Sequence, residues 1–309
     1  MNMGASGIAP SFAAAFGGRI VRKRNALLLF SVFVILGAVL LGRNVSLTLG
    51  RNLLPKEIMN PDTALLIIAS ASLSLFLANI LKIPQSTSQV TVGAITGVGI
   101  YFGQLNLGTL LIKIIPLWII LPLLSYLFTF WLYRKIYPPR HDKLHIYEKI
   151  FRYEKRLKVA ATLASCYVAF AIGSNNVANA VGPLFGAGLI GVLPGLIVIS
   201  PVFGLGAYFL GKGPLETAGK EIVPLGVFSS VIVSFVTATL LLFASFLGIP
   251  QSLVQLNICS IFAISSLKNG HRPTLDLQIT RKTFIIWAVS PVLSLLISYL
   301  ALFIKNKLF

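Results

Sequence analysis

The chain has 309 residues, of which 56% are hydrophobic and 11% charged, and its mean hydropathy is +0.87. A water-soluble domain of this size needs a more polar surface, so the composition excludes a soluble globular protein. The formal net charge of +18 does not indicate nucleic-acid binding, because the basic residues stand in short loops beside apolar runs, without an aromatic-basic recognition pattern.

Apolar runs long enough for membrane helices, which need about 20 residues, follow one another along the chain. They are continuous blocks of Leu, Ile, Val and Phe and lack the period-two alternation of β-barrel strands. We therefore predict an all-α, polytopic protein of the plasma membrane, with the lipid bilayer as its surroundings. The runs cover residues 26–42, 61–82, 108–133, 158–172, 194–211, 223–247 and 283–304.

Two dense basic groups, Arg19–Arg24 and the stretch 134–158, predict cytoplasmic loops because positive charge gathers on that side of a membrane. The second stretch also contains Asp142, Glu148 and Glu154. This mixture favours an amphipathic linker that lies on anionic lipid.

Cysteine and histidine usage gives no sign of catalysis or metal binding. Cys166 and Cys259 lie in separate apolar runs without metal-ligand spacing, which favours packing roles. His141, His145 and His271 fall in loops, and none stands beside a Ser, Cys or carboxylate in a catalytic arrangement. The sequence has no ATP-binding loop either. It therefore predicts neither an enzyme nor a cofactor or metal site.

An internal repeat organises the chain. Residues 36–55 and 205–224 align without gaps at an offset of 169, and Gly, Thr, Pro and basic positions recur together. The same offset pairs 4–11 with 173–180, and an offset of 166 pairs Ile-Pro-Gln-Ser at 83–86 with the same four residues at 249–252. Each half thus carries two polar, Gly- or Pro-interrupted apolar segments, the pattern of a transporter site formed by broken helices at mid-membrane.

The loop charges change sides between the halves. Arg19–Arg24 corresponds to the uncharged 188–193, whereas the uncharged 103–106 corresponds to a loop with four basic residues. The positive-inside rule then predicts two inverted-topology repeats, each with an odd number of crossings. Five crossings fit the first repeat: the first motif segment, 26–42, 61–82, 84–104 and 108–133.

We divide the chain into a first transmembrane repeat at 1–133, a basic cytoplasmic linker at 134–158 and a second transmembrane repeat at 159–309. An apolar run precedes Gly173, but only three residues precede the equivalent Gly4. We therefore expect the first repeat to be N-terminally truncated and the natural chain to start roughly 17–20 residues earlier, the length that completes one crossing.

Polar side chains in the interrupted segments are the candidates for substrate binding, because an unpaired polar group in hydrocarbon costs several kcal/mol. Helix N-termini at the breaks would present N–H groups and a positive dipole end to an anion. The second repeat contributes three asparagines to this set and the first repeat contributes mainly hydroxyl groups. The predicted binding residues are Ser6, Ser11, Ser86, Thr87, Ser88, Gln89, Asn175, Asn176, Asn179, Ser252 and Gln255.

Helix packing is the competing explanation for small residues in these segments, since Gly, Ala, Ser and Thr are common where membrane helices touch. Packing is the favoured role for Gly4, Gly182 and Gly186. For Ser86–Ser88 both roles stay open. Three amides close together are unnecessary for packing, so the asparagines favour binding.

At these residues the chain resembles the inorganic phosphate transporter family, whose inverted halves each carry a Gly-Ala-Asn-Asp-Val-Ala-Asn signature. Residues 173–184, GSNNVANAVGPL, look like the second copy. Residues 83–94, IPQSTSQVTVGA, look like the family's Pro-x-Ser-Thr-[Ser/Thr] segment that ends in Gly-Ala. The resemblance covers essentially the whole chain and implies a secondary transporter coupled to a proton or sodium gradient.

Both carboxylates of the family signature are replaced here. Ser6 and Gly7 stand at the first Asn-Asp, Pro10 at the following Asn, and Asn176 at the second Asp. Phosphate near neutral pH carries hydroxyl hydrogens that a carboxylate accepts, whereas sulfate is a full dianion that a carboxylate repels. Donors without carboxylates, and a similarity to the sulfate permease branch of the family, therefore favour sulfate over phosphate.

The leading hypothesis is an ion-coupled symporter that takes up sulfate. A phosphate carrier is the first alternative, and a non-transporting membrane protein with a degenerate site is an alternative of another class. A passive channel is disfavoured because no basic selectivity ring is visible, and Lys113, within a crossing, is expected to snorkel outward. A homo-oligomer is compatible with the sequence, which does not define the oligomeric state.

Overall fold

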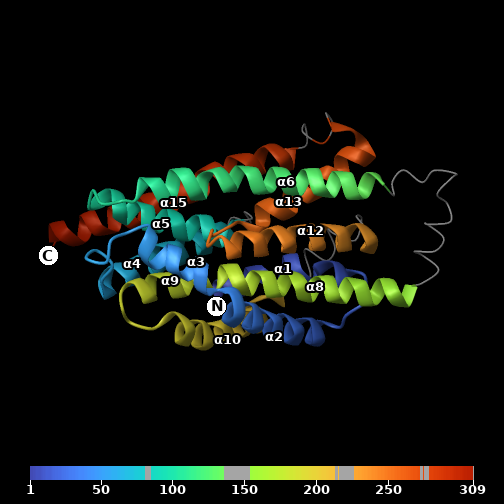
Figure 1. The fold of residues 1–309 in the computed structure, drawn as a ribbon, viewed down its shortest axis with the longest axis horizontal. Coiled ribbons are helices and arrows are strands. Elements are labelled where there is room, and N and C mark those ends of the chain that lie inside the picture. The colour runs from blue at the N-terminus through green and yellow to red at the C-terminus, as the bar shows by residue number, and fades with distance from the viewer. Residues whose placement is uncertain are drawn as a thin grey trace.

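The structure is a computed structural model that describes residues 1–80, 85–135, 154–212, 215, 226–271, 274 and 278–308. Every regular element in this part of the chain is helical, and the helices form one elongated bundle (Figure 1). In the first half they are α1 (Asn2–Gly17), α2 (Lys23–Leu41), α3 (Arg43–Leu47), η1 (Thr48–Asn52), α4 (Pro61–Ile80), α5 (Thr87–Tyr101), η2 (Gly108–Ile114) and α6 (Ile115–Arg134). In the second half they are α8 (Glu154–Asn176), α9 (Ala178–Gly186), α10 (Val192–Leu210), α12 (Val227–Phe246), α13 (Leu253–Asn269) and α15 (Gln278–Leu308).

Six helical stretches of the described chain are long and apolar enough to cross a membrane. They fall on six of the seven predicted apolar runs, and the remaining run, 61–82, corresponds to α4. The stretches are Lys23–Leu41, Gly108–Arg134, Lys155–Gly186, Val192–Leu210, Val227–Phe246 and Trp287–Lys307. The predicted linker lies mostly outside the described residues, as do Glu216, Glu221 and Asp276.

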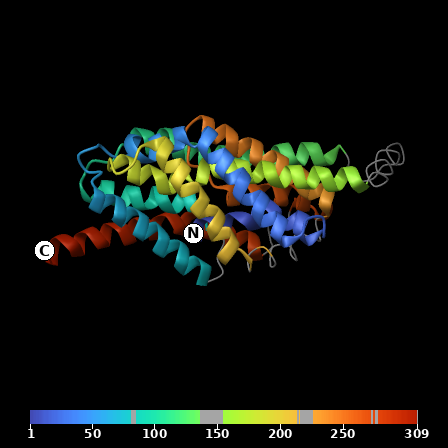
Figure 2. The same cartoon turned by 90° about the horizontal axis from the view of Figure 1, so that it is seen from below.

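Helix α2 shows how these apolar helices divide their surface. Phe30, Val34 and Ala38 are buried, whereas four other apolar residues on the same helix, Leu28, Val32, Leu36 and Leu40, are exposed. Both sets repeat every four residues, so each follows one face of the helix. An apolar face without protein cover is stable only against lipid, and α2 therefore lies at the membrane-facing surface. Figures 1 and 2 show α10 beside it.

The sequence offsets recur in the helix boundaries. Helix α10 begins and ends 169 residues after α2, and α12 begins and ends 166 residues after α4. Even an unusual backbone conformation repeats, because Arg19 has φ +55° and Gly188, 169 residues later, has φ +73°. A left-handed conformation is uncommon for a residue with a side chain, so the repeated chain path explains why Arg19 adopts it.

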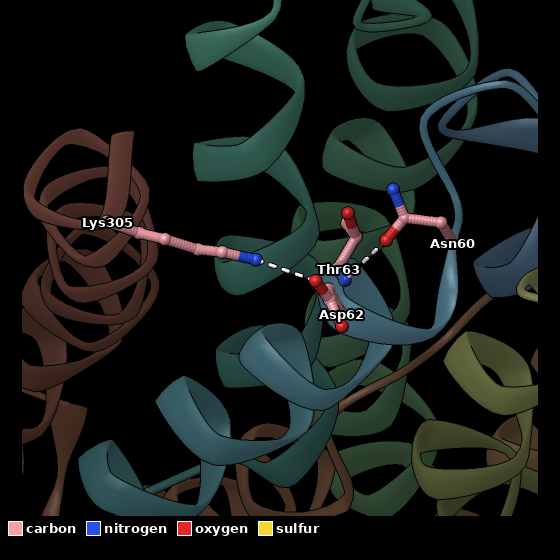
Figure 3. Close-up of polar contacts among 4 residues, drawn as sticks. All are labelled: Asn60, Asp62, Thr63 and Lys305. Carbon is pink, nitrogen blue, oxygen red and sulfur yellow. Dashed lines mark hydrogen bonds and ion pairs between the residues drawn. The ribbon is translucent and has the colours of Figure 1, made fainter. Parts of the chain in front are cut away.

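Helices α4 and α5, in the segments predicted at 61–82 and 84–104, pack against each other as a helical hairpin. Helix α5 has 15 residues, fewer than the roughly 20 that a crossing needs. The outer ends of the hairpin lie beside the C-terminal end of α15, where Asn306 donates a hydrogen bond to the Tyr101 hydroxyl (2.9 Å) and Lys305 pairs with Asp62 (2.7 Å). Figure 3 shows this exposed ion pair, and Asn60 beside it accepts a hydrogen bond from the Thr63 amide at the start of α4.

Helices α12 and α13 form the equivalent hairpin of the second half. Its outer ends lie at the other end of the bundle, toward the start of α8 in Figure 1. There His271 shares a 3.0 Å hydrogen bond with Tyr126 of α6, and Val227 lies beside Gly18 at the end of α1. The two hairpins therefore enter the bundle from opposite ends, and this arrangement brings the start of α5 and the turn between α12 and α13 toward its middle.

Close helix crossings depend on glycine. A Cβ atom on Gly37 of α2 would lie 1.9 Å from the Phe170 carbonyl oxygen of α8, and one on Gly173 of α8 would lie 2.1 Å from the Val34 oxygen of α2. The two glycines let the backbones of α2 and α8 touch on both sides of the crossing.

We predict that Gly37→Ala lowers the free energy of unfolding by about 1–3 kcal/mol or more. The added methyl group would meet the backbone of α8, which cannot move independently. The measurement is thermal unfolding of the purified protein in detergent. Gly108→Ala is the matched control, since its Cβ would have only an ordinary contact of 3.4 Å with the Asn106 side chain. Equal unfolding temperatures for the two variants would contradict this account.

Candidate functional site

The first turn of α5 and the turn between α12 and α13 meet at one buried side chain, Asn175, near the end of α8. Its Oδ1 accepts hydrogen bonds from the Gln251 backbone N–H (3.0 Å) and from the Ser88 hydroxyl (3.4 Å). Its Nδ2 donates to the Ile249 carbonyl oxygen (2.9 Å) and to the Ser245 hydroxyl (3.0 Å). Asn175 is therefore joined to the first turn of α5 and to the turn between α12 and α13.

The two helices that begin at these turns have the same cap. Ser86 precedes α5 and accepts the Gln89 N–H on its Oγ (3.3 Å), and Ser252 precedes α13 and accepts the Gln255 N–H in the same way (3.2 Å). A serine cap satisfies one of the amides that a helix N-terminus leaves without an intrahelical partner. Ser88 in the first turn of α5 and Gln251 just before α13 both hydrogen-bond Asn175, so the remaining first-turn amides and the positive dipole ends of the two helices lie near it.

Asn176 and Asn179 differ from Asn175 in how their amides are used. Asn179 donates through Nδ2 to the hydroxyls of Ser88 (3.2 Å) and Thr87 (3.4 Å), but its Oδ1 has no partner among the described residues. The Oδ1 of Asn176 also has none. Both side chains are buried. A buried amide oxygen without a partner costs about 1–3 kcal/mol, so these two atoms indicate a place for a ligand.

The break between α8 and α9 is smaller than the sequence suggested. Only Val177 separates the two helices, and its φ of −63° and ψ of −33° are helical. Consequently the free helix N-termini at this site come from α5 and α13, which begin after extended residues.

Gln89 and Gln255, equivalent positions of the two repeats, border the same cavity. This cavity has a volume of about 820 Å³ and lies among α5, α6, α13 and α15. Most of its wall is apolar, and it includes Trp118, whose indole N–H donates to the Pro250 carbonyl oxygen (2.8 Å). The Oε1 atoms of both glutamines lack a partner in the described chain. The two repeats therefore present matching amides on one side of the hairpin turns.

The predicted residues of α1 are not joined to this group. Ser6 donates to the Met3 carbonyl oxygen (2.9 Å) and Ser11 to the Gly7 carbonyl oxygen (2.8 Å), both within the same helix. No hydrogen bond between described residues links either serine to Asn175 or to the hairpin turns. Both remain predicted binding residues that the structure does not connect to the others.

The glycines near the site have close packing neighbours. A Cβ on Gly4 would lie 2.1 Å from the Phe203 oxygen, one on Gly182 would lie 2.6 Å from Leu49 Cβ, and one on Gly186 would lie 2.4 Å from the Gly50 oxygen. These contacts support the packing role expected for the three residues.

Sequence reasoning missed two residues of the site. Gln251 is fully buried, and neither polar atom of its side-chain amide has a partner among the described residues. Ser245 joins Asn175 to α12 and also shares a 2.9 Å hydrogen bond with Ser174. The repeated Ile-Pro-Gln-Ser was the available signal for Gln251, whereas the sequence contains no comparable signal for Ser245.

Acidic groups are absent from the centre of the described structure. Of the acidic residues in this part, Glu57 and Asp62 are exposed and Glu154 begins α8. The described residues also include no group of three His, Cys, Asp or Glu side chains able to hold a metal ion. The site therefore consists of neutral amides, hydroxyls and backbone N–H groups.

Residues 3–298 match the phosphate transporter family. The chain belongs to this family. The sulfate permease CysP of Bacillus subtilis is 40% identical to it over 99% of this chain and 85% of that protein. A putative phosphate permease of Methanocaldococcus jannaschii is 26% identical over 96% of this chain and 91% of its own length. A solved structure entitled "The sodium-dependent phosphate transporter" has the same fold, with a TM-score of 0.86, 23% identity, and coverage of 100% of this chain and 96% of that one.

Membership of the phosphate transporter family confirms the resemblance carried by residues 83–94 and 173–184. It also agrees with the six apolar helices, and the chain is a multi-pass, all-helical membrane protein.

We predict that adjacent asparagines behave differently when truncated. Asn175→Ala leaves the Gln251 N–H and the Ile249 carbonyl oxygen unpaired in the interior, at a cost of about 1–3 kcal/mol for each group. Asn176→Ala removes an oxygen without a partner and leaves the unfolding temperature nearly unchanged. Thermal unfolding in detergent compares the two variants. A loss of stability in Asn176→Ala as large as that in Asn175→Ala would refute the distinction.

Proposed function

We propose that the protein is a sulfate permease, a secondary transporter that takes up sulfate by alternating access. The observation that carries the proposal is the meeting of two helix N-termini at a centre with buried amides and no carboxylate among the described residues. Such N-termini bind anions through N–H groups and the helix dipole. The sequence identity of 40% to a protein named sulfate permease supports the same assignment.

Sulfate fits this centre better than phosphate because of the hydrogens that the two ions carry. Sulfate at neutral pH is a dianion with acceptors only, whereas phosphate retains hydroxyl hydrogens that need an acceptor. A carboxylate would serve phosphate and repel sulfate. Since Asn176 stands where the family signature has Asp, the local charge favours sulfate, and phosphate transport is the second candidate within the same family.

The mechanism that we propose depends on two inverted repeats. They cover residues 1–133 and 159–309 and are joined by the linker 134–158. The opposed hairpins, α4–α5 and α12–α13, then act as the two gates around a fixed central site. Their contacts at the opposite ends of the bundle support this role, because each hairpin opens a different side when it moves.

The coupling ion that we propose is sodium. The unpartnered oxygens of Asn176, Asn179, Gln89 and Gln255 are neutral, hard ligands suited to such a cation. A proton would need a titratable carrier, and the carboxylates of the described chain lie away from this centre.

Transport of this kind requires no catalytic step and no cofactor, and it is compatible with a homo-oligomer. A non-transporting membrane protein is the alternative of another class.

Uptake by cells that lack their own sulfate and phosphate carriers tests the substrate. We expect radiolabelled sulfate to accumulate. Asn176→Asp should lower this uptake tenfold or more and favour phosphate, because one unit of like charge within about 4 Å of the anion costs several kcal/mol at low dielectric.

Asn60→Asp is the control for the added charge. It retains the acceptor for the Thr63 N–H at the exposed start of α4, so uptake should not change. Phosphate uptake without sulfate uptake by the unaltered protein would overturn the sulfate assignment, and uptake of neither ion would favour the non-transporting alternative.

Sodium coupling predicts that uptake into proteoliposomes follows an imposed sodium gradient at constant pH. A proton gradient without sodium should drive little accumulation. Empty liposomes and Asn176→Ala proteoliposomes provide the background. Accumulation driven by the proton gradient alone would assign coupling to the proton.

A further inference from the structure

A second cavity lies away from the candidate site, where α2 begins. It has a volume of about 670 Å³ and lies between the start of α2 and Thr162 of α8. Arg22, Arg24 and Asn25 contribute its polar wall, and Leu28 and Leu29 continue it one turn further along α2. The cavity therefore has a basic end and an apolar end.

The two arginines are available for a ligand. Both side chains are exposed, and neither forms an ion pair with a residue in the described part of the chain. The N-cap of α2 is Arg22, which makes no capping hydrogen bond with its side chain. The first amides of α2 and its positive dipole end therefore add to the charge of the arginines.

An exposed apolar stripe leads away from this basic end. Leu28 is 55% exposed, and the stripe continues on the same face of α2 with Val32, Leu36 and Leu40. The twelve residue steps from Leu28 to Leu40 span about 18 Å at the rise of an α-helix. One leaflet of a bilayer contains about 15 Å of hydrocarbon, so the stripe is long enough for one acyl chain.

We propose that this cavity and stripe bind an anionic phospholipid. Arg22 and Arg24 hold the phosphodiester, Asn25 donates a further hydrogen bond to it, and one acyl chain follows Leu28 and Val32. Charge complementarity decides between the possible occupants, because basic pockets between membrane helices suit anionic headgroups and the membrane supplies the chain that the stripe needs. The proposal does not depend on which ion the protein transports.

Binding of phosphatidylglycerol to the full-length protein in phosphatidylcholine nanodiscs or mild detergent, followed by native mass spectrometry, tests the site. Arg22→Gln/Arg24→Gln should weaken phosphatidylglycerol binding by roughly tenfold or more. Lys113→Gln/Lys307→Gln removes the same charge from exposed positions elsewhere and should leave binding nearly unchanged. Unfolding temperatures in pure phosphatidylcholine check that both double variants fold.

Two further measurements separate the lipid from a soluble anion. Leu28→Gln/Val32→Gln should also weaken phosphatidylglycerol binding, because the stripe no longer favours an acyl chain. Glycerol 3-phosphate and inorganic sulfate at millimolar concentration should not displace the lipid. Displacement by either ion, or equal binding by the arginine variant and the lysine variant, would overturn the proposal.

Discussion

The amide of Asn175 is the interaction on which the centre of the molecule depends. One buried side chain holds α8, the start of α5 and the turn before α13 through both of its polar atoms. Both the oxygen and the nitrogen of this amide already form two hydrogen bonds each, so few remain available for a substrate. Its neighbours Asn176 and Asn179 keep oxygens without a partner. A movement of either hairpin relative to α8 breaks bonds at Asn175, and any gating motion must replace them.

Glycine and serine build this centre in different ways: glycine by close packing of helices, and serine by capping helix N-termini. Gly37 and Gly173 bring the backbones of α2 and α8 into contact, which fixes α8 against α2. Ser86 and Ser252 then start two helices directly at the turns that reach Asn175. Each cap leaves further amides of its helix unpaired. Tight packing therefore positions α8, and the serine caps keep N–H groups available beside it.

The sequence predicted the repeated features well, because a repeated local sequence folds into the same local structure. The offset of 166 implied that Ser86 and Ser252 would be equivalent, and both are N-caps. Hydropathy measured the apolar length of 61–82 and 84–104 but could not show that α4 and α5 pack against each other as a hairpin. Asn175 and Asn176 are adjacent residues of the same type, so the sequence does not distinguish their roles. Only the position of the hairpin turns decides which of them is fully hydrogen-bonded, and that depends on contacts between residues about 75 to 90 positions apart.

Charge balance connects the proposed substrate with the proposed coupling ion. The two helix N-termini at the centre contribute roughly half a positive charge each, which compensates about half of a dianion such as sulfate. The described residues supply no cationic side chain at Asn175, so the remaining charge must be balanced in another way. Burial of an uncompensated charge costs far more free energy than the hydrogen bonds of a neutral site contribute to binding. A cation bound beside the anion, on the unpartnered amide oxygens, removes this cost and makes each of the two ions bind more tightly in the presence of the other.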